Sequence, residues 1–338
     1  MKIKSFIRRK LKKYVKKLYH WIMQTGNGGT SEKKSIYVND VKFNYSIDEK
    51  LSWKDKQIMV SQMFYYKNGY YPNLFEPKTF SEKVLWMKLF YKDDRITICS
   101  DKFNGKRYIA DVVGKEYVVP VLKKYENVYD IDLNDLPEQF VLKVNWCTGY
   151  NIIVSNKERV NIDEVRAKLD FWQLPWKSSY YGSFNWGYKN MKPIIFAEEY
   201  LDLSHNTTEY KLFCFNGKVN FFLVEMDYFG KNPERAYYDR NWSELPFSIE
   251  KIKKAHNVMK PNTYDEMIQV AESLAEPFPL VRVDFYDISG KLYVGELTFY
   301  SGGGFSKIYP EEWDEKLGEQ LDIRSAQEKM RNQKEDKV

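Results

Sequence analysis

Two acidic residues stand on a predicted β-hairpin near the C-terminus. Asp284 lies in the alternating apolar segment 282–286 and Glu296 in the segment 292–298, and Ser289-Gly290 forms a two-residue turn between them. Carboxylates held together at the ends of paired strands repel each other unless a cation lies between them. Mg²⁺ is typical there, because proteins bind it through one or two carboxylates and the phosphates of a substrate. The alternative is an ordinary surface hairpin whose acids face solvent.

Two lysines offer the positive charge that a phosphate site needs. Lys143 lies in the apolar strand 140–144, and a loop of mostly small residues, 145–151, connects it to a returning strand. Such a flap can place backbone N–H groups over phosphates while the lysine supplies a point charge. With Gly149 as its one glycine, the flap is by itself a weak phosphate-binding motif. Lys102 stands at the start of a predicted helix, where a plain surface residue is the alternative.

The elements that carry these residues alternate irregularly between helix and strand. Residues 51–92 are predicted to form helices interrupted by a turn at 69–77. Asn216-Gly217 predicts a further hairpin turn, and frequent hairpins favour an α+β body with antiparallel sheets. The predicted strands are 117–122, 140–144, 152–154, 194–197, 210–215 and 219–224, and the later helices are 102–113, 160–172 and 264–275.

The composition argues against several classes of function. The chain has 338 residues, a net charge of +6 and 27 tyrosines, which suits a folded protein. Residues 1–24 carry nine Lys or Arg and no acid, so the remainder is close to neutral and a nucleic-acid partner is not indicated. The three cysteines form no CxxC pair and the three histidines are isolated, so a disulfide framework, a zinc site and histidine catalysis are not expected.

The N-terminal segment is predicted to be a basic amphipathic helix. In residues 1–24 the apolar residues fall near helical spacing against a lysine-rich face, which is typical of a helix on anionic lipid. A basic tail that docks on a partner is the alternative. Residues 25–50 are predicted to form a linker, because 26–34 is rich in Gly, Ser and Thr. No stretch approaches the ~20 apolar residues that span a bilayer, and no secretory signal is expected.

Taken in chain order, the charged segments resemble the ATP-grasp superfamily of carboxylate–amine ligases. A closer likeness is to the TupA-like (teichuronopeptide biosynthesis) branch from bacterial polysaccharide gene clusters, and it covers roughly residues 50–323. Its segments are PKTFSEKVLWMKLF, SDKFNGKRYIADVVGKEYVVPVL, LPEQFVLKVN, NMKPIIFAEEYL, EYKLFCFNGKVNFF, YYDRNWSELPF and FPLVRVDFYDISGKLYVGELTFYSGGGFSKIYPEEWDEKLG.

The resemblance implies an ATP-grasp fold of class α+β, in which two α+β lobes grip ATP, with a helical N-terminal region. The expected divisions are an N-terminal helical or α/β region at 51–135, the ATP-grasp domain at 136–323 and a polar tail at 324–338.

For the nucleotide, the resemblance implies a set of lysines, acids and backbone groups. Lys102 and Lys143 would contact the phosphates of ATP, and Glu198 would accept a hydrogen bond from the adenine amino group. The remaining positions are Tyr200 and Leu201, whose backbone would complete the adenine edge, and Glu209 and Lys211 near the ribose and phosphates.

For the chemistry, the resemblance implies that Asp284 and Glu296 hold Mg²⁺, with Thr298 at the position of a further ligand. Arg282 would face the acyl phosphate, where its planar fork suits a developing oxyanion. Arg235 would grip the acid substrate. The family usually has Asn at the position of Thr298, and a hydroxyl is a weak ligand for Mg²⁺.

The flap also departs from the family pattern. It reads Asn-Trp-Cys-Thr-Gly at 145–149, whereas Asn-His-Gly-Ser-Gly is typical. The bulk of Trp146 and the loss of one glycine could slow flap closure. A degenerate, non-catalytic member is therefore an alternative.

The implied reaction joins a carboxylate to an amine through an acyl phosphate made from ATP. Uronic acid glycans or amino acids are the expected acids, and the amide would lie on a capsular or other cell-surface polysaccharide or its precursor. We expect a cytoplasmic protein, peripheral at the inner face of the bacterial plasma membrane. A glycosyltransferase of the same clusters is the main alternative, although no clear DxD motif is present. A membrane-docked scaffold without chemistry is the third.

Overall fold

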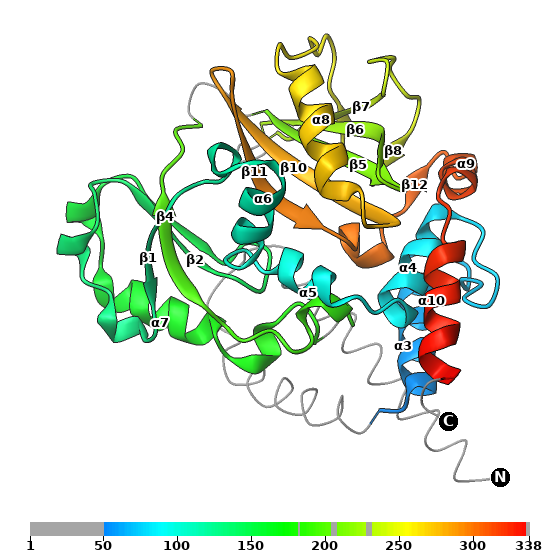
Figure 1. Ribbon diagram of the computed structural model, residues 1–338, viewed down its shortest axis with the longest axis horizontal. Coiled ribbons are helices and arrows are strands. Elements are labelled where there is room, and N and C mark those ends of the chain that lie inside the picture. Colours follow the sequence, from blue (N-terminus) through cyan, green and yellow to red (C-terminus); the bar gives the residue numbers. More distant parts are fainter. Residues whose placement is uncertain (1–50, 182, 204–207, 228–231, 336–338) are drawn as a thin grey trace.

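The computed structural model describes residues 51–181, 183–203, 208–227 and 232–335. The predicted basic helix at 1–24 and linker at 25–50 lie outside the described residues. Figure 1 shows two β-sheets, each with its own covering helix, and a group of helices at the right. No helix among the described residues combines the length and apolar character that crossing a membrane requires.

The smaller lobe is a four-stranded antiparallel sheet in the order β1-β4-β2-β3. Helix α7 covers it (Figure 1), and the core between them includes Phe140, Leu142 and Leu169. Strand β1 belongs to this sheet although it precedes residue 136, because it pairs with β4. The bounds are β1 (Val121–Tyr125), β2 (Phe140–Val144), β3 (Asn151–Val154), β4 (Ile195–Glu199) and α7 (Ile162–Trp172).

The larger lobe is a six-stranded sheet in the order β11-β10-β5-β6-β7-β9, with α8 against one face (Figure 1). Its neighbours pair antiparallel except β7 and β9. Both predicted turns have left-handed backbone at two successive residues, with φ of 50° and 79° at Asn216 and Gly217 and of 52° and 87° at Ser289 and Gly290. The bounds are β5 (Glu209–Phe215), β6 (Lys218–Met226), β7 (Glu234–Asp239), β9 (Lys253–Lys254), β10 (Leu280–Ile288), β11 (Lys291–Thr298) and α8 (Tyr264–Ala275).

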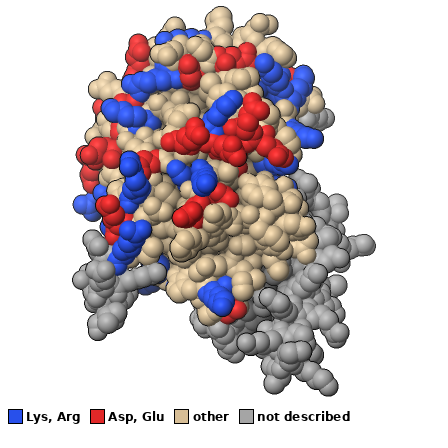
Figure 2. Space-filling view, turned by 90° about the vertical axis from the view of Figure 1, so that its right-hand side faces the viewer, with Lys and Arg blue, Asp and Glu red and all other residues tan. Residues whose placement is uncertain are grey.

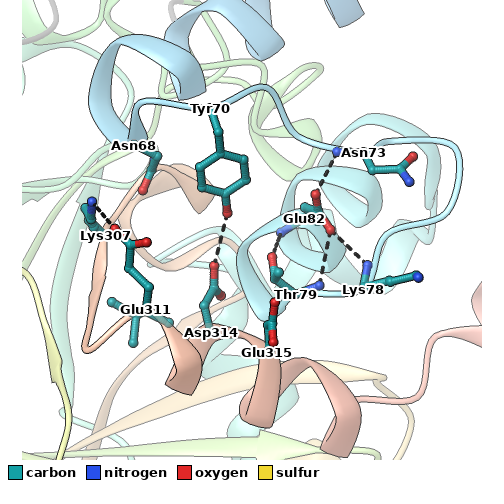
Figure 3. Close-up of a pocket in the computed structure, with 11 residues that line it drawn as sticks. Asn68, Tyr70, Asn73, Lys78, Thr79, Glu82, Lys307, Glu311, Asp314 and Glu315 are labelled. Atoms are coloured by element: carbon teal, nitrogen blue, oxygen red, sulfur yellow. Dashed lines mark hydrogen bonds and ion pairs between the residues drawn. The ribbon is translucent and has the colours of Figure 1, made fainter.

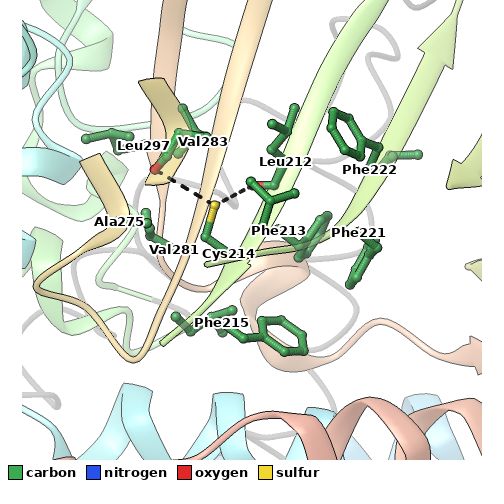
Figure 4. Packing of buried hydrophobic residues seen from close by; sticks show 14 of the residues in the cluster. Leu212, Phe213, Cys214, Phe215, Phe221, Phe222, Ala275, Val281, Val283 and Leu297 are labelled. Atoms are coloured by element: carbon green, nitrogen blue, oxygen red, sulfur yellow. Dashed lines mark hydrogen bonds between the residues drawn. The ribbon is translucent and has the colours of Figure 1, made fainter. Parts of the chain in front are cut away.

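Both faces of β5 are buried, and they differ in what covers them. Cys214 lies on the α8 side with its thiol 4.0 Å from the carbonyl oxygen of Ala271 (Figure 4), and burial raises the pKa of that thiol above its usual value. On the other side Phe215 stacks on Phe80, with ring centroids 5.5 Å apart, and Phe213 stacks on Phe221 at 4.3 Å. This second face is therefore apolar at one end of the sheet, and the charged residues of the site occupy the rest of it.

The helices at the right of Figure 1 close the apolar end of the larger sheet. Thr79 caps α4 by accepting a hydrogen bond from the backbone of Glu82, 3.2 Å away. The short strands β8 (Ser248–Ile249) and β12 (Ile308–Tyr309) pair beside them. The helices of this group are α3 (Trp53–Asn68), α4 (Phe80–Phe90), α9 (Glu312–Gln320) and α10 (Arg324–Glu335). The helices α5 (Asp94–Ser100) and α6 (Gly105–Val113) lie nearer the centre of Figure 1.

Most predicted elements are present, with a few differences. Strand β2 and helix α8 have the predicted bounds, whereas the strand predicted at 117–122 begins at Val121. The reason is Pro120, which lacks the N–H that a ladder needs, although its carbonyl accepts from Glu199. The segment 324–338, predicted as a polar tail, contains α10, and its Lys329 pairs with Asp93 at 2.8 Å.

Candidate functional site

The two predicted metal carboxylates are direct cross-strand partners. Asp284 of β10 pairs with Glu296 of β11, and the next pair is Phe285 with Val294, so Gly295 is an extra residue in β11. Such a β-bulge changes which residues share a face. It brings Glu296 onto the face of Asp284, which looks away from α8.

Arg282 holds Asp284 in place from the same strand. Its Nε and Nη2 atoms donate to the two carboxylate oxygens at 2.6 Å each, a bidentate pair. Nη2 also donates to Thr298 at 3.1 Å and Nη1 donates to Ser301 at 2.9 Å. Burial raises the pKa of Asp284 above its usual value, and Arg282 opposes this shift. The guanidinium therefore orients the carboxylate and ties it to the segment after β11.

Lys102 is paired with Glu296 of β11. The lysine lies in the turn before α6, where the carboxylate of Asp101 accepts from the backbone of Phe103 at 2.8 Å and of Asn104 at 2.9 Å. The predicted helix consequently starts at residue 105 instead of 102. Burial opposes ionisation of Glu296, but Lys102, Arg282 and Lys143 together lower the pKa of the carboxyl below its usual value.

Asn145, at the end of β2, connects the turn of Lys102 to the smaller sheet. It is fully buried, and its amide donates to Asp101 at 2.7 Å and to the carbonyl of Lys192 at 3.1 Å. Its side-chain oxygen accepts from the backbone of Ile194 at 2.8 Å. Its carbonyl accepts from the backbone N–H of Lys102 at 3.1 Å. The side chain and backbone of this one residue thus fix the turn of Lys102 relative to β2 and β4.

Glu198 lies between two lysines on the smaller sheet. It is an ion-pair partner of Lys143 and, at 3.0 Å, of Lys106. Burial would raise the pKa of Glu198, but the two lysines lower it below its usual value. To accept the predicted hydrogen bond from adenine, the Glu198 carboxylate must therefore contact the adenine amino group while it stays paired with Lys143 and Lys106. Tyr200 and Leu201 follow β4 and are half-buried.

A second charged group spans β5, β6 and β7. Lys211 pairs with Glu209 at 2.9 Å and also with Glu225, which is 1% exposed. Arg235 donates from Nε to Glu225 at 2.7 Å. Burial opposes ionisation of Glu225, but Lys211 and then Arg235 outweigh it and lower the pKa of that carboxyl. Glu225 thereby holds the two cations that were predicted for phosphate and for acid substrate.

Trp146, the bulky residue of the flap, lies in the core of the smaller lobe and not among the residues described as lining the cavity. Trp146 is 3% exposed and packs into the core of the smaller lobe, where its indole N–H donates to the carbonyl of Trp172 at 2.9 Å. Thr148 and Gly149 line the cavity instead, and Gly149 has a left-handed φ of 79°. The side chain that departs most from the family pattern is therefore a structural anchor of the flap.

These groups line one cavity of about 680 Å³ between the two sheets. Glu198 lies in a small recess that shares Lys102, Lys143 and Glu296 with the cavity. Tyr200 and Leu201 are outside the described lining of both. The predicted residues that line the cavity are Lys102, Lys143, Glu209, Lys211, Arg235, Arg282, Asp284, Glu296 and Thr298.

Sequence reasoning missed three residues that position this site, namely Lys106, Asn145 and Glu225. For Glu225 a signal existed, because an acid that directly follows the apolar strand 219–224 suggests a buried, paired charge. For Asn145 the signal was its place directly after an apolar strand. For Lys106, on a helix rich in polar residues, no signal distinguishes it from its exposed neighbours.

A second pocket, of about 410 Å³, lies between α4, α9 and the loop after α3 (Figure 3). Two of its acids, Glu82 and Asp314, serve local structure. Glu82 accepts from the backbone of Asn73 at 2.7 Å and of Lys78 at 2.9 Å, and Asp314 accepts from the backbone of Ser81 at 2.8 Å. None of the predicted site residues belongs to its described lining.

The donor set of the main cavity fits Mg²⁺. Asp284 and Glu296 supply carboxylate oxygens, the ligands that this hard cation prefers. Within the described ranges, no group of three or more His, Cys, Asp or Glu side chains could form an all-protein metal cage. Two carboxylates suit an ion whose other ligands are phosphate oxygens and water.

One family model and several solved structures are similar to this chain. The family described as TupA-like ATPgrasp matches residues 82–322. D-Alanine–D-alanine ligase from Bacillus anthracis is 15% identical with a TM-score of 0.40, and the match covers 74% of this chain and 76% of that one. Its complex with ATP is 14% identical with a TM-score of 0.35, covering 60% of this chain and 54% of that chain.

The ADP complex of the PurK protein N5-carboxyaminoimidazole ribonucleotide synthetase is 14% identical with a TM-score of 0.39. That match covers 73% of this chain and 57% of the synthetase. The chain thus spans little more than half the length of two of these proteins. A search of curated proteins gives no match.

Proposed function

Because the chain belongs to the TupA-like ATP-grasp family, and so has the ATP-grasp fold, we propose that it is an ATP- and Mg²⁺-dependent carboxylate–amine ligase. The observation that carries this proposal is the convergence of Lys102, Lys143, Asp284 and Glu296 on one cavity between the lobes. Two lysines and two carboxylates in the lining of one cavity suit a triphosphate that carries a divalent cation.

In the proposed first step, an oxygen of the substrate carboxylate attacks the γ-phosphorus of ATP, and ADP leaves. Lys102 and Lys143 hold the phosphates and offset the charge on their oxygens. Asp284 and Glu296 would hold Mg²⁺, which neutralises charge on the transferred phosphoryl group when bound. Arg282 orients Asp284 and faces the acyl phosphate, while the flap residues Thr148 and Gly149 limit access of water.

In the second step, the amine nitrogen attacks the acyl carbon, inorganic phosphate leaves and the amine loses a proton. No protein nucleophile is needed, so the site requires positioning and electrostatics only. Arg235, held by Glu225, would grip the acid or its phosphorylated form. Glu198, Tyr200 and Leu201 would bind the adenine. The product would be an amide on a cell-surface polysaccharide or its precursor.

We also propose that the protein works in the cytoplasm at the anionic inner face of the plasma membrane, through residues 1–24. Exposed aromatic residues near the start of the described chain support this. Phe75 is 89% exposed, Tyr71 is 60% exposed, and Tyr71 stacks on Tyr65 with ring centroids 4.6 Å apart. Tyrosine suits a membrane–water interface. Figure 2 shows that Lys, Arg, Asp and Glu gather in the upper part and centre of this side of the molecule, with a broad uncharged area below.

A hydroxylamine trap tests the ligase proposal. Hydroxylamine converts an acyl phosphate into a hydroxamate, so the purified full-length protein with ATP and Mg²⁺ should form hydroxamate and ADP when the acid is present. Thermal shifts with ATP and Mg²⁺, compared with UDP- and GDP-sugars, provide the matched binding measurement, and ~100 times Kd of ligand should add about 2.7 kcal/mol. A shift with the nucleotide sugars alone would favour the glycosyltransferase. Binding of ATP without turnover would favour a degenerate member.

A further inference from the structure

The lysine proposed for phosphate and a carboxylate proposed for Mg²⁺ are partners of each other. Lys102 comes from the turn before α6 and Glu296 from β11, and their side chains form an ion pair. Both residues line the main cavity and the small recess beside it. The ammonium of Lys102 therefore contacts the carboxylate that the proposed function assigns to a divalent cation.

The two proposed metal carboxylates have partners of different mobility. Arg282 donates two hydrogen bonds to Asp284. It donates two more, to Thr298 at 3.1 Å and to Ser301 at 2.9 Å, and these contacts together keep the guanidinium in place. Lys102 instead carries a single ammonium on a flexible four-carbon chain. The partner of the second carboxylate is therefore the one that can leave.

This exchange of partners needs no movement of the backbone. The N–H of Lys102 donates to the carbonyl of Asn145 at 3.1 Å, which fixes the base of the lysine side chain. Lys102, Lys143 and Glu296 line the main cavity together. A phosphate group that contacts Lys143 in this cavity offers the Lys102 ammonium a new partner. Rotation of one side chain is then sufficient to expose the carboxylate to a cation.

Breaking the pair is unfavourable unless both of its members gain new partners. The side chains of Lys102 and Glu296 are only 17% and 21% exposed, so water replaces a lost partner incompletely. A divalent cation alone would leave the ammonium beside a second positive ion. A phosphate alone would leave the carboxylate beside a second negative ion. When cation and phosphate bind together, one ion pair is exchanged for two.

We propose that the Lys102–Glu296 pair couples the binding of nucleotide and metal, so that Glu296 takes a divalent cation only when a nucleotide phosphate takes Lys102. This inference rests on the proposed ligase function. Because coupling between two ligands is reciprocal, the cation strengthens nucleotide binding by the same factor. Free Mg²⁺ consequently does not occupy the site ahead of the nucleotide, and a nucleotide without its cation binds weakly.

The first experiment measures the binding of free Mn²⁺ to the full-length protein, without nucleotide, by electron paramagnetic resonance. Mn²⁺ shares the preference of Mg²⁺ for carboxylate oxygen. Lys102→Met removes the ammonium, and we expect it to raise the affinity for Mn²⁺ at least about tenfold above that of the wild type. Lys106→Met is the matched control, because Lys106 lines the recess but pairs with Glu198. We expect this control to change the affinity less than about twofold.

A double variant identifies the carboxylate that gains the metal. Lys102→Met/Glu296→Gln should lose the affinity that Lys102→Met gains. Equal Mn²⁺ affinity in the wild type and in Lys102→Met overturns the coupling, and so does an equal gain in Lys106→Met. Either result leaves the ligase proposal standing if the wild type still binds ATP with Mg²⁺. A gain that persists in the double variant contradicts the proposed metal site itself and, with it, this inference.

The reciprocal experiment measures the affinity for ADP in the presence of EDTA by isothermal titration calorimetry. Glu296→Gln releases Lys102 for phosphate, so this variant should bind metal-free ADP at least about tenfold more tightly than the wild type. Glu312→Gln is the control, because that acid pairs with Lys316 on α9. The reciprocal variant changes the other member of the pair, so it tests the coupling even if Lys102→Met does not fold. Unchanged or weaker ADP binding in Glu296→Gln overturns the coupling.

Discussion

The ring of Tyr286 occupies the space that a side chain at residue 295 would fill. A Cβ added at Gly295 would lie 2.7 Å from Cε2 of Tyr286, closer than real Cβ contacts allow. Gly295 is also the extra residue of the bulge that pairs Asp284 with Glu296. The glycine and the tyrosine together therefore maintain the register on which the proposed metal site depends.

Gly295→Ala should accordingly weaken both the fold and the site. We expect a loss of about 1–3 kcal/mol of unfolding free energy from overpacking, measured by urea denaturation, together with weaker binding of ATP and Mg²⁺. The double variant Tyr286→Ala/Gly295→Ala makes room for the new methyl group. If stability in the double variant falls by the simple sum of the two single changes, the steric explanation is wrong.

Charge at two positions is expected to be essential for turnover. Glu296→Gln keeps the shape of the side chain but removes a proposed Mg²⁺ ligand, and Lys143→Ala removes a phosphate partner. We expect each to lower kcat for ADP release at least about 100-fold, with cooperative unfolding retained. Glu312→Gln is the control, because that acid lies on α9 outside the described lining of the cavity. Turnover like the wild type in Glu296→Gln would refute the metal assignment.

Asn145 should matter for stability more than its size suggests. Asn145→Leu removes one donor from the carboxylate of Asp101 and leaves the backbone N–H of Ile194 without its acceptor in a fully buried place. We expect a loss of about 2–4 kcal/mol of unfolding free energy. Asn127→Ala, which removes an exposed cap on the N–H of Tyr129, should cost only about 1 kcal/mol. Similar losses in the two variants would contradict a central role for Asn145.

The burial of Lys88 predicts that the free energy of unfolding rises with pH in the alkaline range. Burial holds the pKa of Lys88 well below the usual 10.5 in the folded protein. The unfolded chain therefore binds more protons between the folded pKa and 10.5, so the contribution of Lys88 to stability rises as pH increases through that window. Lys88→Met removes this contribution. We expect the slope of unfolding free energy between pH 7 and about 10 to be more positive in the wild type than in the variant. Equal slopes would show that the lysine titrates normally.

Deletion of residues 1–30 tests the membrane proposal. Nine basic residues in the segment 1–24 should each contribute about 1 kcal/mol to binding an anionic bilayer at low screening. We expect the full-length protein to sediment with anionic vesicles in a salt-sensitive manner and the truncated protein to remain in the supernatant. ATP turnover in solution should persist after truncation. Sedimentation that does not change with truncation or with salt would argue against a bilayer as the partner.

Local sequence patterns were sufficient for many elements. The turns at Asn216-Gly217 and Ser289-Gly290 were predictable because only residues that tolerate left-handed backbone form such hairpins. Strand β2 and helix α8 were predictable from their apolar periodicity. Shorter elements such as α5 and the strand β7 were missed, because a few residues of mixed polarity carry little periodic signal.

By itself, the sequence determined the hairpins and the type of most elements, since these depend on neighbouring side chains, and it supplied the residues that we propose for phosphate and metal. Only the tertiary structure decided the pairing of Asp284 with Glu296, because a one-residue bulge moves a side chain to the other face of a sheet. It likewise decided that Trp146 anchors the flap and that Glu225 holds Arg235, because such contacts join residues of different elements whose approach depends on packing.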